Sequence, residues 1–141
     1  MNEKPNELSF DDVSIGQKEI FSTIITESML EEFSKFSGDF NPLHMDNEFA
    51  HSSTFGKRIV HGMLLASFFS QLIGMRLPGK NSLYFSQTIN FRSPCYIDDK
   101  IQVVGEVTEK SNSTRIITIS TSIFNGSGTC LIDGVAKVIV R

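Results

Sequence analysis

The sequence lacks clusters of one charge, and it has no tryptophan. It carries 13 basic and 16 acidic side chains, a net charge of −3, and both kinds are scattered along the 141 residues. Without a basic stripe we expect no nucleic-acid partner, and without an acidic run we expect no disordered tail.

Cysteine is also scarce, and Cys95 and Cys130 do not have the spacing of metal ligands. We interpret each as a buried free thiol. No pair of the three histidines has the spacing and acidic partner of a familiar zinc site, so we predict no bound metal. The opening MNEKPNELSF lacks a hydrophobic signal core, which favours a cytoplasmic location.

One long run, from Ile59 to Met75, contains no Asp, Glu, Lys or Arg. It falls short of the roughly 20 apolar residues that a membrane span needs, and it includes polar residues such as Gln71. A helix that is apolar on nearly all sides is typical of the centre of a globular domain. We therefore predict a buried central helix and no membrane partner.

The segments around this run predict an α+β protein. Residues 18–25 resemble a strand, and a short helix should begin at Thr26 or Ser28, run through Phe36 and end at Gly38. After Gly79 only strand-like segments follow, at residues 82–91, 100–108, 114–124 and 129–140. No helix separates them, so the sheet should be antiparallel and cover the central helix, with residues 1–141 forming one domain.

The stretch Ser37–Asp46, SGDFNPLHMD, contains a candidate acid–base pair. Near neutral pH the His44 imidazole can accept or donate a proton, and the Asp39 carboxylate can orient it or handle a second proton. Pro42 stiffens the loop between them, and Asn41 can hold the turn. On spacing alone a polar surface turn, with His44 as an ordinary hydrogen-bonded side chain, is the better interpretation of these residues. Asp46 is better interpreted as a helix cap.

A second candidate lies at the head of the central helix, in Val60-His61-Gly62-Met63. A helix N-terminus presents unpaired N–H groups, and glycine lets a ligand carbonyl approach, so Gly62 could stabilise an oxyanion. Tight helix–sheet packing is an equally good reason for a glycine there. We interpret His61 as a packed or capping residue rather than a second catalytic group, and His51 as a surface residue.

These residues also resemble a known family. The stretch SGDFNPLH (37–44), the segment RIVHGMLLAS (58–67) and the stretch LPGKNSLY (77–84) are similar to the (R)-specific enoyl-CoA hydratases with a MaoC-like domain. The similarity extends from about Gly16 to the C-terminus and is closest to the short bacterial type linked to polyhydroxyalkanoate synthesis.

The resemblance implies a hot-dog fold, in which an antiparallel sheet wraps a long central helix, and a homodimer. It implies a hydro-lyase that adds water to trans-2-enoyl-CoA and forms (R)-3-hydroxyacyl-CoA. Asp39 and His44 would be the catalytic pair, and Gly62 would bind the thioester oxygen. Asn41 would position the loop or water. Ser70 would border the acyl pocket, although a helix serine that bonds back to the main chain is an equally good interpretation. No separate cofactor is implied, because coenzyme A is part of the substrate.

Three alternatives stay open. An Asp/His-bound water could attack the thioester carbonyl, which would make the chain an acyl-CoA thioesterase. The domain could bind acyl thioesters without catalysis, although both acid–base groups are present. The same chemistry could use an acyl-carrier protein, which would need a local basic patch such as one around Lys57 and Arg58.

Overall fold

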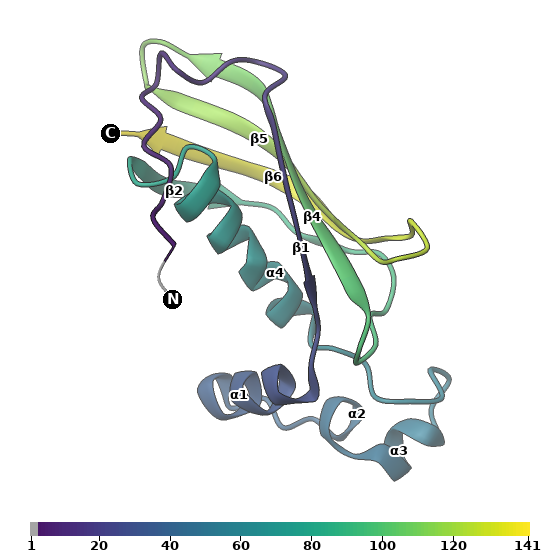
Figure 1. Cartoon of the computed structure of the whole chain (residues 1–141). Helices are drawn as coiled ribbons and strands as arrows, with labels where there is room; N and C mark the ends of the chain where they lie inside the picture. Colours follow the sequence, from purple (N-terminus) through teal and green to yellow (C-terminus); the bar gives the residue numbers. More distant parts are fainter. Residues whose placement is uncertain (1–2) are drawn as a thin grey trace.

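The computed structural model describes residues 3–141 and contains a six-stranded antiparallel sheet with a long helix packed against one face (Figure 1). In chain order the elements are β1 (Lys18–Ile24), α1 (Glu27–Ser37), α2 (Pro42–Met45), α3 (Asn47–His51), α4 (Gly62–Gln71), the π-helical turn η1 (Leu72–Arg76), β2 (Ser82–Gln87), β3 (Asn90–Phe91), β4 (Lys100–Ser111), β5 (Ile116–Phe124) and β6 (Cys130–Val140). The α+β prediction is confirmed.

The sheet runs in the order β1-β4-β5-β6-β2, and β3 also pairs with β6. The segment predicted as one strand over residues 82–91 is therefore two strands. The reason lies at Gly134 of β6, where an added Cβ would lie only 1.8 Å from the Thr88 carbonyl oxygen. The Thr88 backbone approaches β6 closely there, and the regular pairing is interrupted between Gln87 and Asn90 without a change of register.

The central helix consists of α4 and η1, which together span 15 residues from Gly62 to Arg76. It is shorter than the predicted run because residues 59–61 are not helical. Its side chains at Leu64, Leu65 and Phe69 are buried in a cluster with strand residues from β4, β5 and β6. None of the helices in residues 3–141 has the length and apolar character needed to cross a lipid bilayer.

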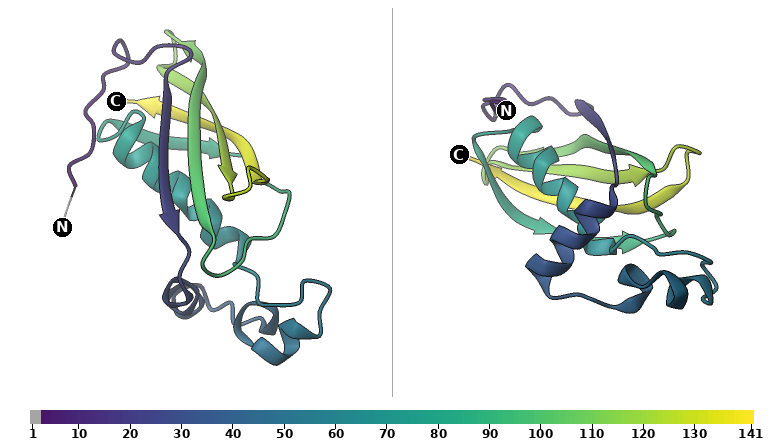
Figure 2. Two further views of the ribbon diagram at one scale, coloured as in Figure 1. Left: turned by 45° about the vertical axis from the view of Figure 1, so that its right-hand side comes forward. Right: turned by 60° about the horizontal axis from the view of Figure 1, so that its bottom comes forward.

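The three shorter helices lie together beyond the end of the sheet where α4 begins (Figures 1 and 2). Their ends follow ordinary capping rules. Thr26 Oγ1 accepts from the Met29 N–H, Gly38 ends α1 with a left-handed φ of 81°, and Asp46 caps α3 by accepting from the Phe49 N–H. These predictions are confirmed, and the capped helices bring the loop after Gly38 to the head of α4.

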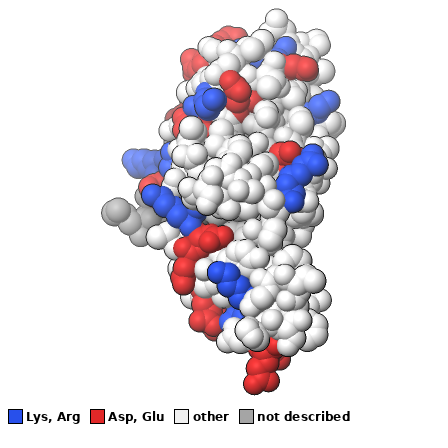
Figure 3. Space-filling model, turned by 90° about the vertical axis from the view of Figure 1, so that its right-hand side faces the viewer, with Lys and Arg blue, Asp and Glu red and all other residues white. Residues whose placement is uncertain are grey.

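Charged side chains are dispersed over the surface. On the face drawn in Figure 3, acidic and basic residues are interspersed and neither sign forms a continuous stripe.

Both cysteines are free; Cys95 is buried as predicted, whereas Cys130 is only half-buried.

Candidate active site

The loop between α1 and α2 holds Asp39 through hydrogen bonds to its neighbours. The Asn41 N–H donates to Asp39 Oδ1 over 3.1 Å, and the Asn41 side chain caps α2 by accepting from the Leu43 N–H over 2.9 Å. Pro42 is the first residue of α2, where its missing N–H costs no hydrogen bond. One oxygen of the Asp39 carboxylate is thus used within the loop, and Oδ2 remains available.

His44 presents one free ring nitrogen to that oxygen. Its Nδ1 lies 2.8 Å from the Ile59 carbonyl oxygen, and because a carbonyl can only accept, Nδ1 carries the proton. In the neutral ring Nε2 is therefore unprotonated, and it lies 4.0 Å from Asp39 Oδ2. The His44 side chain is 15% exposed and that of Asp39 is 47% exposed. A His44 ring with its proton on Nδ1 leaves Nε2 free to accept a proton, as a general base must.

Asp39, His44 and Gly62 line the same cavity, which has a volume of about 420 Å³. Much of the remaining wall is apolar, with Val60, Leu65, Phe91, Leu131 and Ile132 among its residues. Gly62 is the first residue of α4, so its N–H has no intrahelical acceptor. The cavity thus combines a base, a carboxylate and a helix N-terminus in apolar surroundings, where electrostatic interactions are strengthened.

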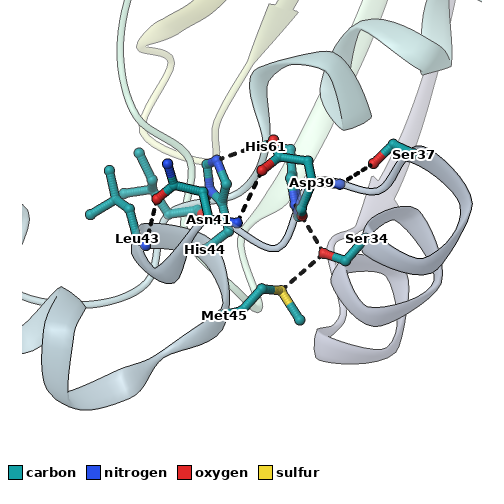
Figure 4. Close-up of polar contacts among 9 residues, drawn as sticks. Ser34, Ser37, Asp39, Asn41, Leu43, His44, Met45 and His61 are labelled. Carbon is teal, nitrogen blue, oxygen red and sulfur yellow. Dashed lines mark hydrogen bonds and ion pairs between the residues drawn. The ribbon is translucent and has the colours of Figure 1, made fainter.

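Two buried side chains, which we did not predict to be part of this site, pack against its residues. His61 does not cap α4 through its side chain; instead its ring stacks on that of His44, with centroids 4.1 Å apart (Figure 4). Ser34 of α1 is fully buried and lies 3.1 Å from His61 Nε2. The sequence does contain one indication that Ser34 is buried: it follows Leu30 by four residues and so lies on the apolar face of α1.

The other predicted site residues lie outside the cavity. Asn41 is exposed and acts within the loop, and Ser70 is exposed on α4 and is not part of the cavity wall. The basic patch considered around Lys57 and Arg58 is wrong for Arg58. Its guanidinium is buried, donates to the His44 carbonyl over 2.6 Å and pairs with Glu27 over 2.8 Å, so it supports α2 instead.

Asp39, His44 and His61 also place one metal-ligating atom each within 4.8 Å of one another. The two imidazoles are inclined by only 28°. Lone pairs lie in the ring planes, so stacked rings direct them side by side and not toward one ion at bonding distance. This geometry suits proton transfer better than metal binding.

Comparison with known proteins agrees with this chemistry. The chain is 40% identical to an (R)-specific enoyl-CoA hydratase from Aeromonas caviae over 131 residues, which is 93% of this chain and 98% of that protein. The solved structure of the A. caviae (R)-hydratase involved in PHA biosynthesis superposes with a TM-score of 0.89, covering 92% of this chain and 98% of that one.

A second solved structure, of an R-hydratase from Pseudomonas aeruginosa in its unliganded form, superposes with a TM-score of 0.93 at 32% identity. The alignment covers 99% of this chain and 89% of that one. The MaoC-like domain family itself matches residues 12–124, which include Asp39, His44, Gly62 and most of the sheet. With its hot-dog architecture, this chain belongs to the MaoC-like domain family.

Proposed function

We propose that this chain is an (R)-specific enoyl-CoA hydratase, a hydro-lyase that reversibly adds water to trans-2-enoyl-CoA and forms (R)-3-hydroxyacyl-CoA. The observation that carries the proposal is the His44 tautomer: its free Nε2 faces Asp39 in a cavity that begins at the N-terminus of α4. The 40% identity to a protein named (R)-specific enoyl-CoA hydratase supports the same reaction.

The distance between His44 Nε2 and Asp39 Oδ2, 4.0 Å, is too long for a direct hydrogen bond and suits one water that donates to both atoms. His44 Nε2 takes a proton from this water as the oxygen attacks C3. The proton held by His44 passes to the Asp39 carboxylate, and Asp39 delivers it to C2, so both side chains end in their starting protonation states. One water is consumed, and the reaction is redox-neutral.

Attack at C3 moves negative charge onto the thioester oxygen. The Gly62 N–H would receive this charge at the positive end of the helix dipole. The apolar wall around Gly62 would keep bulk water from competing for this N–H. Coenzyme A enters only as part of the substrate.

We assign Asn41 to the loop rather than to the water, because its side chain is used to cap α2. Ser70 is exposed on α4, so we propose that it would contact only a longer acyl chain or a second protomer.

The decisive experiment follows the loss of enoyl absorbance with crotonyl-CoA, together with chiral analysis of the product. Asp39→Asn and His44→Gln should stay folded and lose about 10²–10⁴-fold in turnover, the usual contribution of one acid–base group. A parallel assay for released thiol separates the hydratase from a thioesterase. Near-normal hydration by either variant, or an (S) product, would contradict the proposal. Tight binding of enoyl-CoA without turnover would favour a binding module.

We also propose that residues 1–141 act as one domain and assemble as a homodimer. The support is the edge of the sheet, where Leu83, Phe85 and Phe91 are more than half exposed although they are large and apolar. Light scattering that returned a monomer would refute the dimer.

A further inference from the structure

His61 is nearly inaccessible, with 2% of its surface exposed, yet it touches both halves of the candidate catalytic pair. One face of its ring stacks on His44, and its other neighbour is Phe33 of α1, with centroids 4.8 Å apart. Its Nε2 lies 3.1 Å from the Asp39 backbone carbonyl oxygen. Figure 4 shows His61 beside Asp39 and His44, at the meeting point of α1, the loop and the head of α4.

The direction of each hydrogen bond follows from the partners. The Asp39 carbonyl can only accept, so His61 Nε2 carries the proton and donates. The Ser34 hydroxyl, 3.1 Å from the same nitrogen, donates to Met45 Sδ over 3.0 Å and can therefore accept from His61. Burial lowers the pKa of His61, which favours this neutral ring. Neutral His44 and His61 thus hold opposite tautomers, one with the proton on Nδ1 and the other with it on Nε2.

We infer that His61 is a positioning residue that fixes the Asp39 main chain and the plane of the His44 ring. The inference rests on the proposed hydratase function. Asp39 belongs to a loop and His44 to a helix of four residues, and such short elements do not hold a fixed geometry by themselves. His61 directly precedes α4, and its backbone is therefore held by that helix. Its hydrogen bond then fixes the Asp39 main chain, and its stacked ring fixes the His44 ring.

His61 itself is not a catalytic residue. Its Nε2 is occupied by the Asp39 carbonyl, and its Nδ1 is buried without a hydrogen-bond partner among residues 3–141. Neither nitrogen can reach a substrate proton. The effect of replacing it should therefore come through misplacement of Asp39 and His44.

The test compares two substitutions at position 61. His61→Phe keeps a ring for stacking but removes the donor, whereas His61→Gln places an amide nitrogen near the position of Nε2. With crotonyl-CoA, we expect kcat of His61→Phe to fall about 10–100-fold while KM changes less than about threefold, the pattern of a misplaced catalytic group. We expect His61→Gln to recover most of the lost kcat.

Ile25→Val serves as the control, because Ile25 is fully buried in the hydrophobic cluster that includes Leu64 and Leu65 of α4 and does not line the cavity. It should lower the melting temperature and leave kcat unchanged. A wild-type kcat in His61→Phe, or equal losses in the Phe and Gln variants, would overturn the inference.

A readout without turnover separates this inference from the proposed function. The chain has only three histidines, so their ring nitrogens can be resolved by long-range ¹H–¹⁵N NMR. We expect His61 in the Nε2–H tautomer and faster exchange of the Asn41 amide, which donates to Asp39, in His61→Phe than in His61→Gln. An Nδ1–H tautomer, or equal exchange in the two variants, would refute the positioning role. If the wild type had no hydratase activity, the proposed function would fail and these spectra alone would decide the role of His61.

Discussion

The two ends of the central helix differ in how their unpaired backbone groups are satisfied. At the C-terminal end, the Asn6 N–H donates to the Met75 carbonyl and its side-chain amide donates to the Arg76 carbonyl, both over 2.9 Å. Residues from the N-terminal segment, including Phe10 and Val13, complete a buried cluster around Ile73 and Leu77. At the N-terminal end, by contrast, Gly62 lines the cavity. We call these the closed end and the open end of the helix.

This difference shows how one helix can serve both stability and chemistry. Every helix leaves unpaired carbonyls at one end and unpaired N–H groups at the other. Here the chain closes the carbonyl end with its own N-terminal segment, while the N–H end faces the cavity that holds Asp39 and His44. Because the exposed end is the positive one, it is the end suited to an oxygen that becomes negative. Three glycines allow this comparison to be tested: Gly62 begins the helix, Gly74 lies within η1, and Gly79 follows three residues after η1 ends.

The largest effect should come from Gly62→Ala, at the open end. An added Cβ would lie 2.5 Å from a ring carbon of Phe91, so either the ring or the start of α4 must move. Since a displacement of about 1 Å can cost about 10²-fold in rate, we expect kcat to fall by about 10–100-fold with a smaller change in melting temperature. Steady-state kinetics with crotonyl-CoA measure this. Replacing Phe91 by Leu in the same chain should restore part of the rate by making room for the new methyl group, and unchanged kcat in Gly62→Ala alone would argue against an oxyanion site there.

The elements around the N-terminal end of the central helix were largely predictable from the sequence, because they depend on interactions between residues close together in the chain. The turn chemistry at Gly38, Asn41 and Asp46 acts over a few residues, so the sequence predicts where the loop begins and where α3 is capped. The apolar run after Val60 likewise predicts a buried helix. They predict the elements that carry Asp39, His44 and Gly62, whereas the prediction that these residues share one site came from the resemblance to a known family.

What the sequence did not reveal depends on contacts between distant segments. The stacking of His61 on His44 and its contact with Ser34 join residues 17 and 27 positions apart, and no local pattern predicts them. Arg58 looked like a free surface cation until its contact with Glu27, 31 positions away, showed that it is buried. The Asn6 contacts with η1 span about half the chain. The sequence thus indicated the positions of the candidate catalytic groups but not the side chains that support them.

An intermediate effect, on stability alone, is expected from Gly79→Ala at the closed end. Gly79 has a φ of +89°, and an added Cβ would lie 2.1 Å from the Asn6 backbone oxygen. A left-handed backbone at a residue other than glycine costs about 1–2 kcal/mol, and the clash would add to it by displacing the N-terminal segment. We expect the free energy of unfolding to fall by about 1–3 kcal/mol in urea denaturation, while kcat at 25 °C is retained. A matching loss of kcat would show that the two ends are coupled.

The smallest effect, and one of opposite sign, is expected from Gly74→Ala in the middle of η1. Gly74 does not have a positive φ, and apart from its chain neighbours and the backbone of its own helix a Cβ there would meet no atom within 4 Å in residues 3–141. Alanine restricts the unfolded chain more than glycine does and favours helical backbone, which is worth up to about 1 kcal/mol. Urea denaturation should therefore show a small gain in stability with unchanged kcat. A loss as large as that of Gly79→Ala would mean that this side of the helix is covered in solution, and the same denaturation repeated over a range of protein concentrations would reveal whether a second protomer covers it.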